Sequence, residues 1–407
     1  MPTRTYYFPN NLTHLEEILE AEGIQIPTQK ILHFRNVNAA PLLEPETISI
    51  FLGVSPKLIY SIIRKIDVHY RTFHLLKKNG NFRKIDAPRT YLKVIQWWIL
   101  DNILVRQSVR PEVFGFVPKR SAVMNAEYHR GAKRILNVDI KDFFPSISQI
   151  KVNNVFRNIG YSEEVSEVLA KLCCLDSKLP QGAPTSPAIA NLVMWEIDQK
   201  LQLLSEEQGI CYSRYADDLS FSSQQWISQA FFEDVASIIK DEGFELNANK
   251  SRFAGLGQQM EVTGVVINKV HQPPRKWRKR VRASLHRLEH QDRLTRRDLR
   301  YLNGIAAMGM QYPESVQLQK LSQQAISLSC QKRETVVGFG ARPRLPMNLT
   351  IRQAETLAAL RIWRGDNGER LHRFAGDNGN DYLLARAMRK IDAKNVDEAY
   401  KWAEEHL

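Results

Sequence analysis

The chain has 407 residues, of which 43% are hydrophobic and 25% are charged, a composition typical of globular proteins. Its 57 Lys and Arg outnumber its 44 Asp and Glu, so the formal net charge is +13. This excess favours a polyanionic partner, first nucleic acid and then an anionic membrane surface. No apolar run approaches the roughly 18 residues that a membrane span needs. The sequence therefore predicts a cytoplasmic protein without a membrane span, and nucleic acid rather than a membrane is its expected partner.

The four cysteines include no CxxC pair, which argues against a disulfide scaffold and against a zinc site. In chain order, periodic apolar residues predict helices at 11–24, 55–66 and 91–107. Two apolar stretches around Asn79-Gly80 predict a β-hairpin at 73–85. The middle of the chain mixes the two patterns, with strands expected at 134–140, 210–223 and 260–267 and helices at 149–158, 163–174, 188–204 and 228–242. Mixed elements in this order predict an α+β fold.

The positive charge is concentrated near residue 280. Residues 275–300 contain 11 basic and 3 acidic residues, a net charge of +8, and apolar positions at spacings of three and four predict a helix that begins after Pro273-Pro274. A solvated helix face is the alternative, but we favour contact with phosphates. Residues 334–407 carry a net charge of only +1 and include a linker-like segment at 338–346, which predicts a small, mostly helical C-terminal extension of unknown role.

Three carboxylates are candidates for catalysis. Asp217 and Asp218 are adjacent in an alternating segment, and their repulsion is costly unless a cation lies beside them. Asp139 follows a predicted strand and supplies a third carboxylate. Carboxylate oxygens are ligands that magnesium prefers, and paired metal ions stabilise phosphoryl transfer. An Asp-Asp pair alone is also common in exposed turns, and we interpret the nearby Asp142 as a helix cap or a surface residue.

Three motifs occur in order over about eighty residues: NVDIKDFFPSI at 137–147, LPQGAPTSP at 179–187 and YADD at 215–218. Together they resemble the catalytic-aspartate, LPQG and YxDD blocks of reverse transcriptases. NAEYH at 125–129 and VTG at 262–264 resemble the NAxxH and VTG motifs of bacterial retron reverse transcriptases. The similarity covers roughly residues 50–325 and leaves out the C-terminal extension.

This resemblance implies the right-hand polymerase fold, with fingers, a palm of antiparallel sheet and helices, and a helical thumb. The implied domains are an N-terminal helical extension (1–70), fingers and palm (71–268), a basic helical thumb (269–333) and the C-terminal extension (334–407). It also implies that Asp139, Asp217 and Asp218 bind two magnesium ions that align the primer hydroxyl with the incoming triphosphate.

The resemblance implies further contacts. For the deoxynucleoside triphosphate they are Arg83 and Lys84 at the phosphates, Phe144 against a 2′-hydroxyl, Gln181 and Gly182 in the nucleotide pocket, and Lys250 near the leaving pyrophosphate. Solvated charges at 83, 84 and 250, and a core position for Phe144, are the alternatives. For nucleic acid they are Asn125 and His129 of NAxxH and the thumb residues Arg275, Lys276, Arg278, Lys279 and Arg282.

The implied function is that of a retron reverse transcriptase. Such an enzyme copies its cognate structured non-coding RNA into branched, multicopy single-stranded DNA within an antiphage defence system. Its implied partners are this RNA, the RNA–DNA product, deoxynucleoside triphosphates and a separate effector protein. The alternatives are another bacterial defence or group II intron-like reverse transcriptase, and a catalytically silent RNA-binding scaffold. The complete set of three aspartates disfavours the scaffold.

Overall fold

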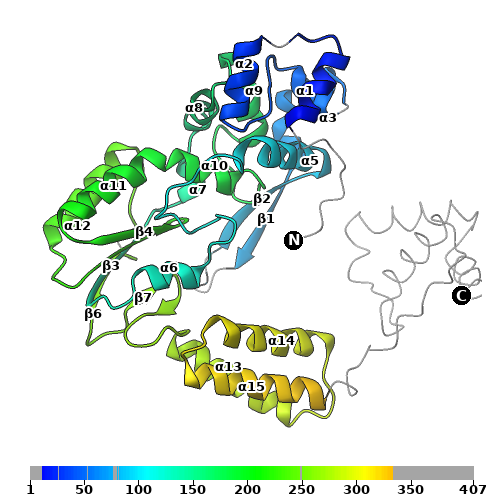
Figure 1. Ribbon diagram of the computed structural model, residues 1–407. Coiled ribbons are helices and arrows are strands. Elements are labelled where there is room, and N and C mark those ends of the chain that lie inside the picture. Colours follow the sequence, from blue (N-terminus) through cyan, green and yellow to red (C-terminus); the bar gives the residue numbers. More distant parts are fainter. Residues whose placement is uncertain are drawn as a thin grey trace, which may run out of the picture. The chain divides into compact units, whose positions relative to one another are not determined.

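The computed structural model describes residues 12–25, 27–52, 54–76, 80, 82–247 and 250–332. The chain divides into two compact units, Met1–Pro274 and Arg275–Leu407 (Figure 1). The predicted linker at 338–346 and the predicted C-terminal extension lie outside the described residues.

The first unit begins with helices α1 (Leu12–Ala21), α2 (Thr28–Asn36), α3 (Thr47–Leu52) and α4 (Pro56–Arg64). At α4 the hydroxyl of Ser55 accepts a hydrogen bond from Lys57 N, and Pro56 occupies the first helical turn, where its missing N–H costs nothing. The buried apolar residues of these helices belong to the same hydrophobic core as the central sheet. The predicted N-terminal extension therefore shares its core with the domain that follows it.

A two-stranded hairpin comes next, as the sequence predicts. After the 3₁₀ turn η1 (Ile66–His69), β1 (Tyr70–Leu76) pairs antiparallel with β2 (Phe82–Pro88). Alternate residues of a strand point to opposite faces, so Arg83 and Lys84 project in opposite directions from β2. Helix α5 (Thr90–Ile99) and the π-helical turn η2 (Leu100–Leu104) follow, and together they form most of the helix predicted at 91–107.

The centre of the unit is a four-stranded antiparallel sheet with the strand order β4-β5-β3-β6. Its strands are β3 (Arg134–Asp139), β4 (Cys211–Tyr215), β5 (Asp218–Ser223) and β6 (Arg252–Gly255). β4 and β5 form the hairpin hidden in the predicted strand at 210–223. A second, short hairpin joins β7 (Glu261–Val262) to β8 (Val265–Val266), where a single strand was predicted.

The two faces of the sheet differ in chemistry. On one face the rings of Tyr212 and Phe221 stack at 5.1 Å between centroids, and Phe231 of α12 (Gln229–Asp241) meets Phe221 edge-on at 5.2 Å. Ser213 and Ser222 alternate with these aromatic residues and face the C-terminal end of α6 (Ala122–Tyr128). Helices α11 and α12 lie side by side along the sheet in Figure 1.

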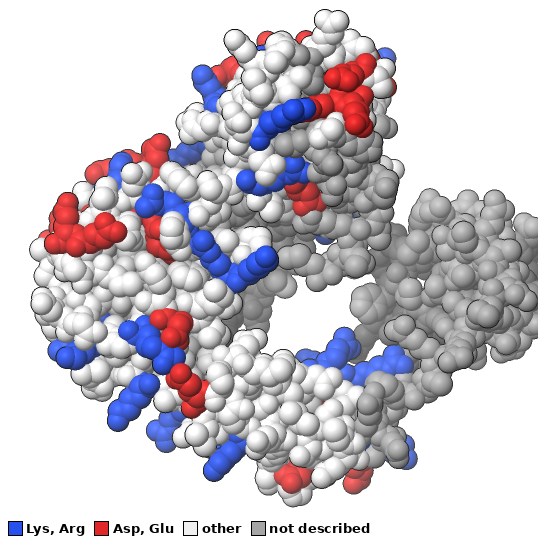
Figure 2. All heavy atoms as spheres, in the orientation of Figure 1, with Lys and Arg blue, Asp and Glu red and all other residues white. Residues whose placement is uncertain are grey.

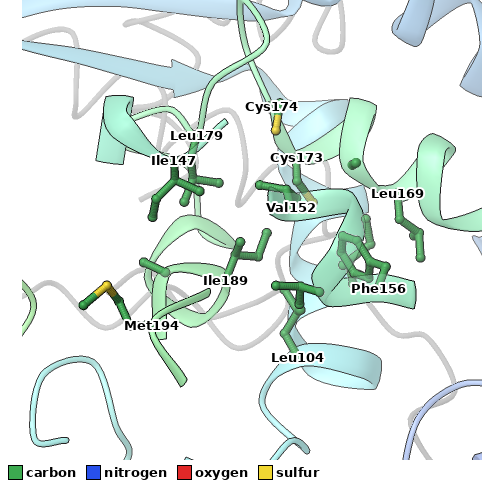
Figure 3. Close-up of a cluster of buried hydrophobic side chains, with 14 of the residues drawn as sticks. Leu104, Ile147, Val152, Phe156, Leu169, Cys173, Cys174, Leu179, Ile189 and Met194 are labelled. Atoms are coloured by element: carbon green, nitrogen blue, oxygen red, sulfur yellow. The ribbon is translucent and has the colours of Figure 1, made fainter. Parts of the chain in front are cut away.

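A helical layer supports the rest of the core. Figure 3 shows apolar side chains from η2, α8 (Gln149–Ile159), α9 (Glu163–Cys173) and α10 (Ser186–Val193) packed together, Phe156 and Ile189 among them. The helix predicted at 188–204 is two helices, because α10 ends at Val193 and α11 (Trp195–Glu207) begins after Met194. The short helix α7 (Phe143–Ser146) connects β3 to this layer.

The described part of the second unit contains three helices: α13 (Arg275–Glu289), α14 (Arg296–Gln311) and α15 (Val316–Gln331). α13 is the helix predicted after Pro273-Pro274. Their core consists of aliphatic residues, including Val281, Leu302 and Leu321. α14 begins with a capping box, in which Thr295 and Asp298 satisfy each other's backbone N–H groups.

Candidate active site

Strand pairing brings the predicted carboxylates together. Asp139 is the last residue of β3 and lies directly opposite Asp218, the first residue of β5. Asp217 lies in the two-residue turn between β4 and β5, and its carbonyl accepts a hydrogen bond from Ile140 N at 2.9 Å. The three aspartates therefore occupy one end of the sheet, although 77 residues separate Asp139 from the next of them in the sequence.

A lysine compensates part of the negative charge. Lys250 Nζ lies 2.6 Å from Asp139 Oδ2. Asn247, three residues earlier in the chain, donates a backbone hydrogen bond from its N to Asp139 O at 2.8 Å. Burial opposes the charge of Lys250, but its hydrogen bond and ion pair with Asp139 outweigh that effect and raise the pKa of the lysine. Lys250 therefore lies beside Asp139, and its place near a leaving pyrophosphate stays a prediction.

The remaining carboxylates stay poorly compensated. Desolvation, and then the negative charges of Asp217 and Asp139, raise the pKa of Asp218 to about 6. Desolvation and the charge of Asp139 also raise the pKa of Asp217. A cation at this end of the sheet would relieve both effects.

A cleft of about 740 Å³ opens beside the aspartates, within the range of roughly 300–1,000 Å³ that small-molecule sites span. Residues from distant parts of the sequence line it: Arg83, Phe116, Asp139, Ile140, Lys141, Asp142, Phe143, Phe144, Pro145, Gln181, Gly182, Ala183, Ser186, Pro187, Asp217, Asn247 and Lys250. Arginine and lysine thus meet carboxylates around one cavity. Such a set suits a metal-bound polyphosphate.

The two predicted triphosphate cations differ in position. Arg83 lines the cleft, and its charge lowers the pKa of Asp217 against the stronger effects that raise it. Lys84 is not among the residues that line the cleft, and its Nζ pairs with Asp86 Oδ2 at 3.3 Å. The alternation of β2 accounts for this difference. Of the pair, the geometry favours Arg83 as the residue that faces a bound phosphate.

Gln181 and Gly182 join the cleft to the hairpin. Asp86 N donates to Gln181 O at 2.9 Å. Gly182 has φ +133°, and a Cβ there would lie 2.8 Å from Asp86 O. We expected this glycine to allow close approach of a nucleotide. The close neighbour in the structure is instead the backbone of β2, so Gly182 fixes the hairpin against the cleft wall.

Phe144 has an aromatic neighbour that the sequence interpretation missed. Phe144 lines the cleft, half-buried, and its ring centroid lies 6.0 Å from that of Phe116. Phe116 has φ +63°, an uncommon conformation for a bulky residue, which holds an exposed ring at the cleft. No motif marks Phe116. Its only signal is the preceding Gly115, which indicates a close backbone contact.

Of the two roles predicted for Asp142, the helix cap is wrong, whereas the surface position agrees with its exposed side chain. Asp142 occupies the N-cap position of α7, but its side chain makes no capping hydrogen bond and its backbone is left-handed, with φ +44°. An N-cap side chain reaches the helix N–H groups from an extended backbone, which this residue lacks. Asp142 instead lines the cleft as a further carboxylate.

The prediction that Asn125 and His129 contact nucleic acid is also wrong. Their exposed fractions are 0% and 1%, because residues four apart share the buried face of α6. His129 bridges two strands, with Nε2 2.6 Å from Ser213 Oγ and Nδ1 2.7 Å from Ser222 Oγ. Thr263 of the VTG hairpin donates from Oγ1 to Ala122 O at 3.0 Å. The two motifs are therefore structural neighbours.

The basic residues of α13 are mostly exposed. Arg275, Lys276, Lys279 and Arg282 face solvent, and Figure 2 shows Lys and Arg side chains on the visible surface of the helical unit. Arg278 is an exception with 9% exposure, because it shares the face of Val281 and Leu285. Burial and the neighbouring Arg282 and Arg275 lower its pKa. The prediction that Arg278 contacts nucleic acid is therefore wrong, because its side chain is buried.

The aspartates offer oxygen donors to a divalent ion without forming a closed metal cluster. Among the described residues, no group of three or more His, Cys, Asp or Glu converges as a ready-made metal cluster. Asp139 is hydrogen-bonded to Asp218 and paired with Lys250. The donors nevertheless fit magnesium, since all are carboxylate oxygens. Desolvation and then neighbouring negative charge raise the pKa of Asp217 and Asp218, and a cation would stabilise their charged forms.

The described part of the chain has no helix with the length and apolar character needed to cross a membrane.

The part of the chain that matches known proteins contains the cleft. The family described as reverse transcriptase (RNA-dependent DNA polymerase) matches residues 75–277, a range that contains every residue lining the cleft. The chain is 39% identical over 240 residues to the retron Ec86 reverse transcriptase of Escherichia coli, covering 58% of this chain and 75% of that one. It is 35% identical over 264 residues to the retron Mx65 reverse transcriptase of Myxococcus xanthus, covering 59% and 62%. A telomerase structure from Candida albicans matches with 10% identity and a TM-score of 0.40, covering 86% and 70%.

Proposed function

This chain belongs to the retron reverse transcriptases, which are RNA-directed DNA polymerases with the right-hand polymerase fold, and we propose that the cleft beside Asp139, Asp217 and Asp218 is its polymerase active site. The enzyme would copy a cognate structured non-coding RNA into branched, multicopy single-stranded DNA, within an antiphage defence system that includes a separate effector protein. One observation carries the assignment of the site. Asp139, Asp217, Lys250 and Arg83 line a single cleft inside the region that matches the family, and Asp218 lies directly opposite Asp139 in the sheet.

Each residue has a distinct task in nucleotidyl transfer. Reverse transcriptases use divalent metal ions, and the three aspartates would hold two magnesium ions in this chain. When bound, these ions supply positive charge that stabilises the attacking and leaving oxygens. Arg83 would hold the triphosphate, and Lys250 would move from Asp139 to the leaving pyrophosphate as metal replaces it. Gln181 lies at the nucleotide base.

The half-buried ring of Phe144 would exclude a 2′-hydroxyl from the cleft. Its contact with Phe116 and Phe143 restrains the ring, which gives the exclusion a rigid wall. The exposed Arg275, Lys276, Lys279 and Arg282 of α13 would contact the phosphates of the template and product strands. These contacts would give a function to part of the net charge of +13.

Primer extension on an RNA template tests the site. We expect Asp217→Ala combined with Asp218→Ala to abolish DNA synthesis, because the remaining Asp139 cannot hold both ions. Asp234→Asn is the matched control, since this aspartate is exposed on α12 away from the cleft lining and should leave synthesis intact. Synthesis by the double variant at the rate of the unaltered enzyme would show that the polymerase site is elsewhere.

The product tests the retron assignment separately. Nucleic acid that co-purifies with the protein from its host should be single-stranded DNA joined to RNA through a 2′,5′ branch. Treatment with RNase should remove the RNA and leave the DNA. Linear complementary DNA without a branch would instead favour a group II intron-like or another defence reverse transcriptase. RNA without any DNA would favour the silent scaffold.

A further inference from the structure

Behind the YADD turn lies a buried ion pair that the catalytic mechanism does not use. Arg214 of β4 and Asp198 of α11 both have an exposed fraction of 0%. The guanidinium donates from Nε to Asp198 Oδ1 and from Nη2 to Oδ2, both at 2.7 Å. The hydroxyl of Tyr212 donates to Asp198 Oδ1 at 2.8 Å. The carboxylate is thus held by three hydrogen bonds in a planar, two-pronged geometry.

The third guanidinium nitrogen connects this pair to the turn. Arg214 Nη1 donates to Ala216 O at 3.2 Å and to Asn191 Oδ1 at 3.1 Å. Asn191 Nδ2 in turn donates to Gly115 O at 3.0 Å. The backbone of the turn residue Ala216 and that of Gly115 are therefore joined through two buried side chains.

Gly115 contacts the same turn directly. A Cβ at this position would lie 2.3 Å from Ala216 N and 2.9 Å from Tyr215 C, both backbone atoms that cannot move aside. The segment before it runs along the edge of β4, since Arg214 N donates to Glu112 O at 3.0 Å and Phe114 N donates to Arg214 O at 2.8 Å. The segment 112–115 is thereby held against β4 and the backbone of the turn.

The conformation of the turn explains why such support is needed. Ala216 has φ +61° in a two-residue hairpin turn, a conformation that glycine, asparagine or aspartate adopts more readily than alanine. A backbone in a sparsely populated region persists only where its surroundings fix it. Asp217 and Asp218 follow immediately, so a small rotation at Ala216 would displace both carboxylates.

Stability alone does not account for the arrangement. Replacing a buried ion pair by apolar residues is often neutral, so its presence is weak evidence for a stabilising role. The residues of this network do not line the cleft, so they are not catalytic residues. We propose that they form a positioning brace, which sets the backbone of the catalytic turn and thus the placement of its two aspartates; the members of the brace are Gly115, Asn191, Asp198 and Arg214. This inference rests on the proposed polymerase site.

Gly115→Ala is the first test, and Gly257→Ala is its matched control. A Cβ at Gly257 would meet nothing within 4 Å, and this glycine lies outside the cleft lining. We expect Gly115→Ala to lower kcat for primer extension about 100-fold, as displacements of about 1 Å do at active sites, while KM for the template-primer stays near that of the unaltered enzyme. Gly257→Ala should change neither constant.

Asn191→Ser is a milder second test, because it removes the link to Gly115 and leaves the Arg214–Asp198 pair intact. Its counterpart is Tyr212→Phe, which removes one hydrogen bond to Asp198 but no contact with the turn. We expect a lower kcat and a higher magnesium requirement for Asn191→Ser, and near-normal values for Tyr212→Phe. Thermal melting and circular dichroism measure the folded fraction of every variant.

The outcomes separate the brace from the active site. The brace is refuted if folded Asn191→Ser or Gly115→Ala enzyme retains its normal kcat, or if activity falls only in proportion to the folded fraction. Loss of activity on substituting Asp217 and Asp218, together with normal kcat in the brace variants, would leave the polymerase site standing and remove the brace alone. Full activity without those two aspartates would refute the proposed site itself.

Discussion

His129 is a buried imidazole that lies between the hydroxyls of Ser213 and Ser222. Burial lowers the pKa of His129 to about 4 in the folded protein. An unfolded histidine has a pKa of about 6.5, so between these values the unfolded chain binds the proton more tightly. Stability from the neutral ring is therefore complete above about pH 6.5 and is lost as the pH falls toward 4.

The prediction compares the native chain with His129→Gln. At about pH 5 the native protein should lose about 2 kcal/mol of unfolding free energy relative to neutral pH through this residue. Glutamine keeps hydrogen-bonding groups near the serines but cannot be protonated. Urea unfolding at both pH values should therefore give a smaller loss for the variant. Equal losses for the two proteins would show that His129 binds its proton equally well in the folded and unfolded chain, which would contradict a lowered pKa in the folded protein.

The residues of the site were predictable to different degrees. Asp139, Asp217 and Asp218 lie in motifs whose order identifies them, and the sheet register then brings them together. The face of Arg278 was assigned wrongly because an arginine in a basic helix was expected to face nucleic acid. The stem of an arginine packs well along apolar side chains, so position 278 completes the buried stripe. Phe116 depends on a left-handed backbone that its local sequence does not predict.

At the level of elements, two helices of the second unit approach closely at a glycine. A Cβ on Gly309 of α14 would lie 2.3 Å from Ser322 Oγ and 2.5 Å from Ser322 Cβ on α15. The same serine donates a hydrogen bond to Ala306 O at 3.0 Å, so it has little freedom to move. Gly304, one and a half turns earlier in the same helix, faces open space.

This contrast gives a prediction with an internal control. Gly309→Ala should destabilise the protein by about 1–3 kcal/mol, because the added methyl group overpacks the helix interface. Gly304→Ala should stabilise it by up to about 1 kcal/mol, since alanine favours the helix and meets no neighbour. Thermal melting of the two variants should shift in opposite directions. A rise in melting temperature for Gly309→Ala would contradict the close packing of α14 on α15.

The elements themselves were largely predictable from periodicity. The hairpin of β1 and β2 and the helices α8, α9 and α12 lie where the apolar pattern places them. The division of one predicted helix at Met194 was not predictable, because neither glycine nor proline marks it and the chain turns there to pack α11 on β4. The short strand β6 was missed because its pairing with the distant strand β3 defines it. Strands β7 and β8 were merged because only Thr263 and Gly264 turn the chain between them.

At the scale of the whole molecule, composition alone indicated a basic protein, and the structure shows where part of that charge lies. The net charge of +13 pointed to a polyanion, and the exposed positions of α13 now specify which side chains reach solvent. The C-terminal residues 334–407 carry almost none of this excess. This extension lies outside the described residues, and both its helical character and the separate effector protein stay predictions.

The exposed residues of α13 should act through phosphate contacts, whose signature is salt dependence. Each neutralised phosphate releases counterions, so affinity falls as salt rises, with a slope set by the number of contacts. Replacing Arg275, Lys279 and Arg282 by Gln should weaken binding of a double-stranded RNA and reduce the slope of log K against log salt by about 2 to 3. The control replaces three exposed lysines of the first unit, Lys30, Lys57 and Lys240, which removes equal charge. Fluorescence anisotropy at several salt concentrations measures both slopes, and equal reductions in the two variants would mean that net charge, rather than α13, determines RNA affinity.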